Sequence, residues 1–294
     1  YEVISRTVKA SKIPPERAGE IPFEIVHPVL WSPERRNMYN VEVTLGEYKH
    51  PMDRVVVRTG FRSIEVKDDN KLYINDKLVD VRGVSLAHDR AGVGTALSRE
   101  HYDEDFATLR DMGANALRSL AGPHDGYLYD KCDRKGVLAW IDVPLCRSEF
   151  AFSDICYYPT EALRNNGFEQ LKEVILQNYN HPSVVMWGIF WYVWQRGDDV
   201  VGYVGELNDL AHRLDMSRPT VSSSNTDGAI NFVTDLVVLR QNIGWMKGSI
   251  EDVDIWCDQL SSNSSWATLR CGVSYGEAGV RGHNVERITR AEYN

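Results

Sequence analysis

The stretch that decides the fold is HPSVVMWGIFWY, residues 181–192. Residues 184–190 form an apolar run with β-branched and aromatic side chains, which indicates a strand. Comparable runs recur on both sides of it, at residues 115–120, 138–144, 219–224, 235–240 and 270–276. Helical patterns separate most of these runs, for example at residues 167–179 and 200–214. Strands that alternate with helices predict a parallel sheet with right-handed crossovers.

A further strand is expected at residues 81–85, which brings the predicted parallel strands to seven. A helix should follow it, with Ser98 as N-cap, an end at Gly113 and an apolar face made of Tyr102, Phe106, Leu109 and Met112. The chain stops about eighteen residues after the seventh strand, whereas a closed (β/α)8 barrel requires one more βα unit. We therefore expect a barrel truncated after strand seven, unless the count misses one strand.

The first 65 residues have a different pattern. Short alternating or β-branched runs at residues 23–26, 39–45 and 54–58 are separated by Pro and Gly, which predicts part of an antiparallel β-sandwich. A hairpin is expected at residues 73–77, where the pattern changes to strand, loop and helix. We therefore divide the chain into residues 1–65, a partial sandwich domain, and residues 66–294, a barrel domain.

Composition limits the classes of partner. The net charge of −9 and the absence of Lys/Arg clusters interleaved with aromatics argue against nucleic acid. No apolar run approaches the roughly 18 residues of a membrane span. The start lacks the features of a signal peptide but is not Met, so periplasmic or secreted and cytoplasmic locations both stay open. Oligomerisation is possible.

Cofactor signals are missing from the sequence. The five Cys show no CxxC spacing, so buried free thiols are expected, with a Cys146–Cys156 disulfide as the alternative. The His residues are scattered without HxH or HExxH spacing, and no Gly-rich phosphate loop occurs. We therefore predict no metal and no cofactor.

Several motifs resemble glycoside hydrolase family 2, which includes β-galactosidases and β-glucuronidases. They are Pro28–Glu34, Gly60–Glu65, Met112–Arg118, the Asn-x-x-His-Pro-Ser-Val segment at 178–184, and Trp187-Gly188-x-Phe190. The resemblance implies an α/β fold, a (β/α)8 TIM-type barrel preceded by part of an Ig-like β-sandwich domain. It also implies hydrolysis of O-glycosyl bonds, with a carbohydrate or another small molecule as ligand.

The two catalytic carboxyl positions of that family are altered here. Retaining hydrolysis needs two carboxyl groups about 5–5.5 Å apart. The family's fourth strand runs into Asn-Glu, but this chain has Trp191-Tyr192. At the seventh strand the family's Ser-Glu-Tyr-Gly is replaced by Ser-Tyr-Gly-Glu, ending at Glu277. A shift of two residues keeps the same face and moves the group roughly 6.6 Å. Glu277 is therefore expected as a displaced nucleophile or base; alternatively it is a solvated loop residue or a partner of Arg240 or Arg281.

Other residues at the carboxyl ends of the strands complete the expected site. By resemblance Arg118 orients the nucleophile, and Tyr275 is an unusual nucleophile candidate. Asp142 is expected to line the floor of the site, or else to cap a loop or pair with Arg118. The proton donor is sought among Asp142, His88 and His124, while His88 and Asp89 could instead form a loop salt bridge with Arg90. Substrate contacts are expected from His88, Asp89, His124, Trp191, Tyr192, Trp194, Asn225, Arg240, Asn242 and Trp245.

These residues leave more than one function open. The first hypothesis is an O-glycosyl hydrolase with an atypical catalytic pair. The alternatives are a catalytically inactive or sugar-binding homologue with an aromatic-rich mouth, and a repurposed or engineered barrel in which Glu277 is a general base with a raised pKa.

Overall fold

The computed structural model describes residues 4–7, 21–47, 50–69, 71–147, 160–193, 199–225, 228–241, 243, 248–249, 251–262 and 271–275. Its centre is a parallel sheet in which strands adjacent in the sheet follow one another along the chain. The strands are β6 (Gly83–Leu86), β7 (Ala116–Ser119), β8 (Leu138–Asp142), β10 (Val184–Val193), β11 (Thr220–Ser224), β12 (Leu236–Gln241) and β13 (Cys271–Tyr275). A two-residue strand, β9 (Cys146–Arg147), pairs with the end of β10.

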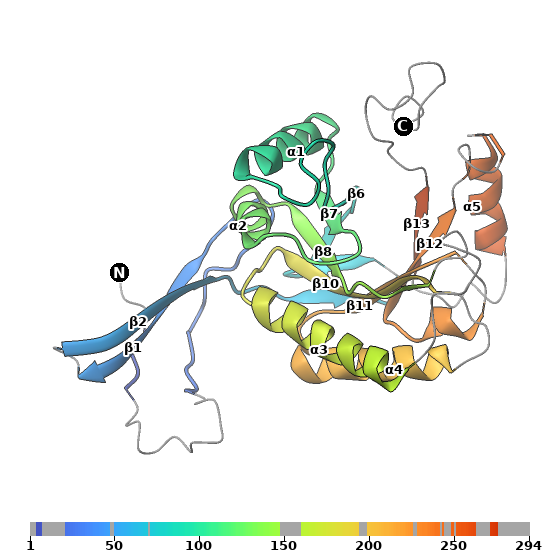
Figure 1. The fold of residues 1–294 in the computed structure, drawn as a ribbon. Coiled ribbons are helices and arrows are strands. Elements are labelled where there is room, and N and C mark those ends of the chain that lie inside the picture. Colours follow the sequence, from blue (N-terminus) through green and yellow to red (C-terminus); the bar gives the residue numbers. More distant parts are fainter. Residues whose placement is uncertain are drawn as a thin grey trace.

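The sheet confirms the barrel prediction, because all seven expected strands occur where the sequence indicated them. Each neighbouring pair is parallel. Within the described residues, β6 and β13 are the two ends of the sheet and do not pair with each other. The described residues therefore form an open, partial TIM-type barrel, as Figure 1 shows.

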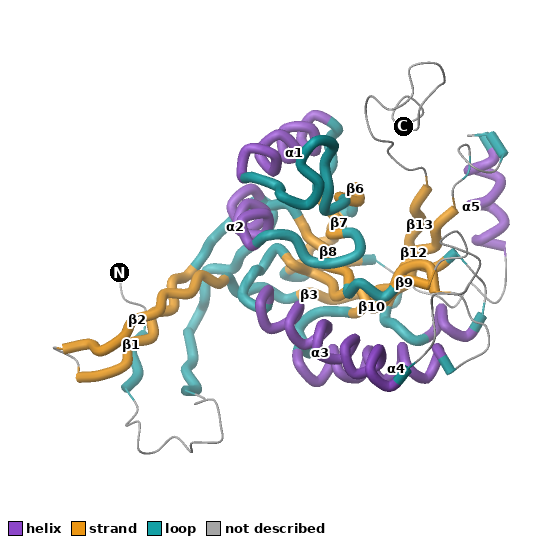
Figure 2. The backbone as a smooth tube through the Cα atoms, viewed as in Figure 1, coloured by secondary structure: helices purple, strands orange, loops and turns teal. Residues whose placement is uncertain are grey.

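Helices lie between the strands, as the alternation predicted. They are α1 (Arg99–Asp111), α2 (Gly126–Lys135), α3 (Glu161–Asn178), α4 (Val200–Leu214), α5 (Asp252–Ser262) and the short 3-10 helix η2 (Ala229–Phe232). Figure 2 shows α3 and α4 running together along one side of the sheet, and both pack against β10. No helix in the described part of the chain combines the length and apolarity needed to cross a membrane.

The helix predictions were accurate except at their ends. The α4 helix has the predicted bounds and begins after Asp199, whose side chain accepts a hydrogen bond from the Gly202 N–H. The α3 helix begins earlier than predicted because Thr160 caps it, accepting from the Leu163 N–H. Met112 was wrongly assigned to the apolar face of α1: it is the C-cap and is 66% exposed, because the helix has already ended there.

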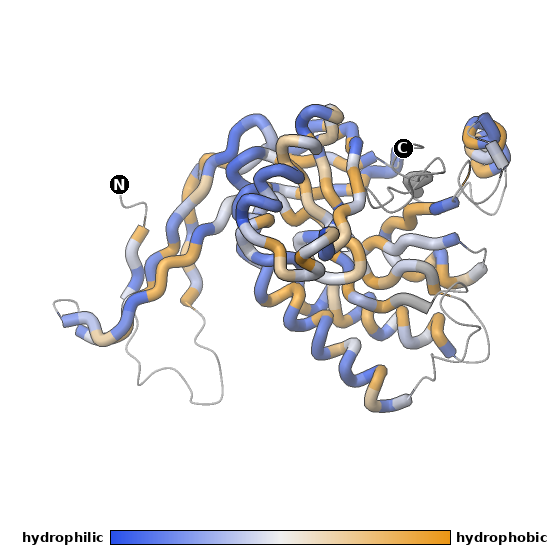
Figure 3. Tube along the Cα trace, turned by 45° about the horizontal axis from the view of Figure 1, so that its top comes forward, coloured by the Kyte–Doolittle hydropathy of each residue, from blue (hydrophilic) through white to orange (hydrophobic). Residues whose placement is uncertain are grey.

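The hydrophobic core lies between the sheet and its helices. Strand β10 crosses its centre, and within residues 184–190 only Met186 is not fully buried. Trp187 and Phe190 pack in one cluster with Tyr203 of α4, and Figure 3 shows apolar residues in both the strands and the helices. Cys132 is a buried free thiol in the same cluster, as predicted, whereas Cys257 is also a free thiol but is only half-buried.

The N-terminal residues form smaller antiparallel units. The strands are β1 (Tyr39–Glu47), β2 (His50–Thr59), β3 (Ile64–Val66), β4 (Leu72–Ile74) and β5 (Lys77–Val79). β1 and β2 form a two-stranded ribbon, and β3, β4 and β5 form a separate sheet that contains the predicted hairpin. The strand predicted at residues 23–26 is wrong: the backbone there has no ladder partner among the described residues, and Val26 is 72% exposed. The domain division at residue 65 stays a prediction.

The N-terminal segment is anchored to the amino ends of the barrel strands. Trp31 is fully buried, and its Nε1 donates to the Asp133 carbonyl at 3.0 Å. Arg62 donates from Nε to the Pro182 carbonyl and from Nη2 to the Val184 carbonyl, each at 3.1 Å. These contacts lie at the end of the sheet opposite to the carboxyl ends of the strands, so they stabilise the scaffold and leave those ends free for a site.

Candidate active site

A buried ion pair joins the carboxyl ends of β7 and β8. Arg118 of β7 donates from Nε to Asp142 Oδ2 at 2.9 Å, and its Nη2 lies 2.8 Å from the same oxygen. The Asp142 side chain is fully buried and that of Arg118 is 6% exposed. Burial, the largest effect, raises the pKa of Asp142, although Arg118 acts in the opposite direction. Both residues are predicted site residues, and the structure brings them into contact.

Two neighbours that the sequence did not single out shape this pair. The Trp140 ring lies beneath the Arg118 guanidinium, with 4.2 Å from Cζ to the ring centroid, which is a cation–π arrangement. Gly188 of β10 stands opposite Asp142 in the parallel register. A Cβ on Gly188 would lie 2.2 Å from Asp142 Oδ1 and 2.4 Å from Trp140 Nε1. The carboxylate therefore occupies space that only glycine leaves open.

The loop between β7 and α2 adds a backbone donor. The Ala121 N–H donates to Asp142 Oδ2 at 3.3 Å, and Ala121 has φ of 63°, in the left-handed region. A non-glycine residue with positive φ is uncommon and costs free energy. The loop thus holds a strained backbone where its amide reaches the carboxylate of the ion pair.

His88 and His124 form a second group beside the pair. Their rings stack with centroids 4.5 Å apart, and Tyr102 meets His124 edge-on at 5.9 Å. His124 Nε2 lies 3.2 Å from the Leu86 carbonyl, which can only accept, so Nε2 carries the proton. Burial, with a smaller effect from His88, lowers the pKa of His124 to about 4. His124 is therefore neutral near pH 7.

Asp89 and Arg90 do not pair with each other. Arg90 instead bonds to Glu104 at 2.5 Å and Asp105 at 2.6 Å, both on α1. Asp89 is exposed, and His88 is half-buried. The alternative of a loop salt bridge between Arg90 and His88 or Asp89 is thus wrong, because two carboxylates of the following helix take the guanidinium.

The remaining predicted residues divide into two groups. Trp191 is half-buried in β10, Arg240 is buried in β12, and Asn225 directly follows β11, so all three lie toward the carboxyl ends of strands. Glu277, Trp194, Asn242 and Trp245 lie outside the described residues, and Tyr192 and Tyr275 are described only as backbone of β10 and β13.

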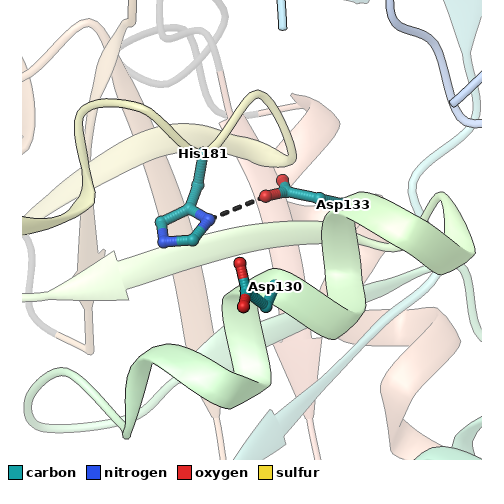
Figure 4. A group of neighbouring side chains, drawn as sticks. All are labelled: Asp130, Asp133 and His181. Atoms are coloured by element: carbon teal, nitrogen blue, oxygen red, sulfur yellow. Dashed lines mark hydrogen bonds and ion pairs between the residues drawn. The ribbon is translucent and has the colours of Figure 1, made fainter. Parts of the chain in front are cut away.

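One cluster has the residue types of a metal site. Figure 4 shows Asp130 and Asp133 of α2 converging with His181, which precedes β10, and their ligand atoms lie within 4.8 Å of one another. Asp133 Oδ2 is 2.7 Å from His181 Nδ1, while Oδ1 accepts from the Ser183 N–H and hydroxyl. Because both carboxylate oxygens of Asp133 already accept hydrogen bonds within the protein, we interpret the cluster as a structural contact that holds the amino end of β10 against α2.

The comparisons with known proteins agree with this geometry. Residues 64–264 match the pattern of the TIM barrel domain of glycosyl hydrolases family 2, and residues 2–62 match a second pattern of glycosyl hydrolases family 2. A β-glucuronidase of Bacteroides fragilis is 35% identical over 89% of this chain and 37% of its own length. A β-galactosidase of Thermoanaerobacter pseudethanolicus is 32% identical over 66% of this chain and 25% of its own length.

Solved structures give the same result. A putative β-galactosidase from Bacteroides fragilis has a TM-score of 0.75 at 28% identity, covering 87% of this chain and 37% of that one. Bacteroides uniformis β-glucuronidase 2, covalently bound to cyclophellitol-6-carboxylate aziridine, has a TM-score of 0.73 at 27% identity, covering 86% of this chain and 32% of that one. The chain thus spans about a third of the length of such relatives. It belongs to glycoside hydrolase family 2.

Proposed function

We propose that this chain carries the barrel site of an O-glycosyl hydrolase that acts on β-glucuronides or β-galactosides through an altered carboxyl pair. The observation that carries the proposal is the Arg118–Asp142 ion pair at the carboxyl ends of β7 and β8, where barrel enzymes hold their reactive groups. The names of the relatives support the substrate class. A covalently bound inhibitor in one relative fits a mechanism with a nucleophile.

We assign the nucleophile or base to Glu277, with Arg118 orienting it. Asp142 is fully buried and bonded to both Arg118 and the Ala121 N–H, which suits a residue that fixes the guanidinium. A carboxyl group held in this way exchanges protons with a substrate only if the site rearranges. We therefore assign Asp142 a positioning role.

We assign the proton donor to His88 and not to His124. His124 has a pKa lowered to about 4 by burial, so it holds little proton at neutral pH. His88 stacks on the same ring but is only half-buried, so its edge can reach a ligand. Because the acid/base position of the family holds an aromatic residue, we expect turnover about 10²–10⁴-fold below that of an enzyme with a positioned acid/base.

The test compares release of nitrophenol from β-glucuronide and β-galactoside substrates by the chain and by Glu277→Gln. A matched control is Glu206→Gln, since Glu206 lies on α4 and pairs with Arg164, away from the strand ends. We expect release that Glu277→Gln abolishes and Glu206→Gln leaves unchanged.

Three results would contradict the proposal. Equal release by Glu277→Gln would remove Glu277 from the mechanism. Sugar binding measured by calorimetry without any release would instead support a sugar-binding homologue. The absence of both sugar binding and nitrophenol release would favour a repurposed barrel.

A further inference from the structure

The loop from β7 to α2 is held on both sides of its strained turn. Before the turn, the Leu120 N–H donates to the Leu86 carbonyl at 3.1 Å. The turn itself contains Ala121 with φ of 63° and Gly122 with φ of 145°. After the turn, the His124 N–H donates to the Tyr129 hydroxyl at 2.8 Å. The strained segment is therefore fixed by partners from two different elements, β6 and α2.

The Tyr129 hydroxyl is the fixed point of this arrangement. Tyr129 lies on α2, is fully buried, and its hydroxyl is also 2.9 Å from Ser119 Oγ at the end of β7. The Tyr129 hydroxyl oxygen thus connects Ser119 before the turn and His124 after it to the helix α2. A hydroxyl can accept one hydrogen bond while donating another, so it satisfies both partners at once.

The turn between these two anchors carries the amide that reaches the site. The Ala121 N–H is 3.3 Å from Asp142 Oδ2, the same oxygen that receives Arg118. This backbone hydrogen bond lowers the pKa of Asp142, against the larger opposite effect of burial. If the turn relaxed, Ala121 would leave its left-handed conformation and its amide would turn away from the carboxylate.

We propose that Tyr129 is a positioning residue of the site: its hydroxyl holds the Ala121–His124 turn, and through it the amide that fixes Asp142 beside Arg118. Any effect of Tyr129 on catalysis rests on the proposed function. The coupling between the Tyr129 hydroxyl and the Asp142 carboxylate can be measured whether or not the chain turns over a substrate. Its failure can therefore be separated from that of the proposed function.

The test is Tyr129→Phe, which removes one oxygen from a buried ring. The matched control is Tyr127→Phe on the same helix, because the Tyr127 hydroxyl bonds to Asp103 on the exposed side. We expect amide hydrogen exchange of residues 120–124 to accelerate roughly tenfold in Tyr129→Phe, as loss of a buried partner implies. We also expect NMR titration to give a higher pKa for Asp142, with neither change in the control.

The outcomes separate the inference from a purely structural role. Unchanged exchange in residues 120–124 overturns it, and so does faster exchange with an unchanged Asp142 titration. If Tyr129→Phe does not fold, Ser119→Ala removes the other hydroxyl and should loosen the same loop by a smaller factor. If the chain hydrolyses glycosides, Tyr129→Phe should lower kcat more than it changes KM; absence of turnover in the unmodified chain affects only the proposed function.

Discussion

Gly188→Ala is the sharpest perturbation of the site that the structure offers. The added Cβ would lie 2.2 Å from Asp142 Oδ1, 2.4 Å from Trp140 Nε1 and 2.9 Å from Asp142 Cα. Rotation of the two side chains could relieve the first two contacts. The third involves backbone, and β10 and β8 are hydrogen-bonded here, with the Val143 N–H donating to the Gly188 carbonyl at 2.8 Å. The strands must therefore move apart, or the carboxylate must leave Arg118.

The cost follows from the geometry. Overpacking a well-packed core costs about 1–3 kcal/mol, and the backbone contact puts this position at the upper end, about 3 kcal/mol. Displacing the carboxylate would also weaken the ion pair with Arg118. Any turnover that depends on this pair should therefore fall together with the free energy of unfolding.

Urea unfolding followed by far-UV circular dichroism measures the effect, and Gly205→Ala is the control. A Cβ on Gly205, inside α4, meets nothing within 4 Å, so that change should raise the free energy of unfolding by about 0.5–1 kcal/mol. The same substitution is thus expected to act with opposite sign at the two glycines. Equal unfolding midpoints for Gly188→Ala and the unmodified chain would refute the packing argument.

Two further predictions concern charge. The pKa of His124 is lowered to about 4, so between pH 6.5 and pH 4 the unfolded chain binds a proton on this imidazole that the folded chain does not. The free energy of unfolding should therefore fall by about 3 kcal/mol as the pH drops through that window. Urea titrations at several pH values should show that His124→Gln removes this contribution. Arg118→Met leaves the buried Asp142 carboxylate without its cation and should lower the free energy of unfolding by about 3–5 kcal/mol at pH 7. Because Arg118 lowers the pKa of Asp142, its loss raises that pKa further. Asp142 is then protonated more readily at pH 5, so the loss of stability relative to the unmodified chain should be smaller there. A deficit that does not change with pH would contradict the second argument.

The fold was largely predictable because its signals are local. Each of the seven strands carries its own apolar run, and alternation with helices indicates parallel pairing. Errors occurred where local pattern is not enough. Residues 23–26 have strand composition but no described ladder partner, and Met112 continues the apolar periodicity of α1 past the helix end.

The site was predictable only in part, for the same reason. Arg118 and Asp142 stand at the ends of recognisable strands and match motifs of the family there, so both could be named from the sequence. Tyr129 and Gly188 act across the fold: one is a helix residue bonded to a loop, the other a strand residue that leaves space for a neighbour's side chain. Neither contact has a sequence spacing that would reveal it.

The two ends of the sheet differ in how completely their polar groups are paired. At the amino ends, Arg218 bonds to Asp215 at 2.5 Å and to the Val184 carbonyl at 2.7 Å, and Asp215 also accepts from Trp187 Nε1. At the carboxyl ends, Trp140 hydrogen-bonds to the Asp142 carboxylate that Arg118 also contacts, whereas the buried His124 Nδ1 has no hydrogen-bond partner among the described residues. An unsatisfied buried group costs about 1–3 kcal/mol. The unpaired His124 nitrogen lies near the strand ends where barrel enzymes hold substrate, so hydrogen-bonding capacity is left on that side of the described sheet.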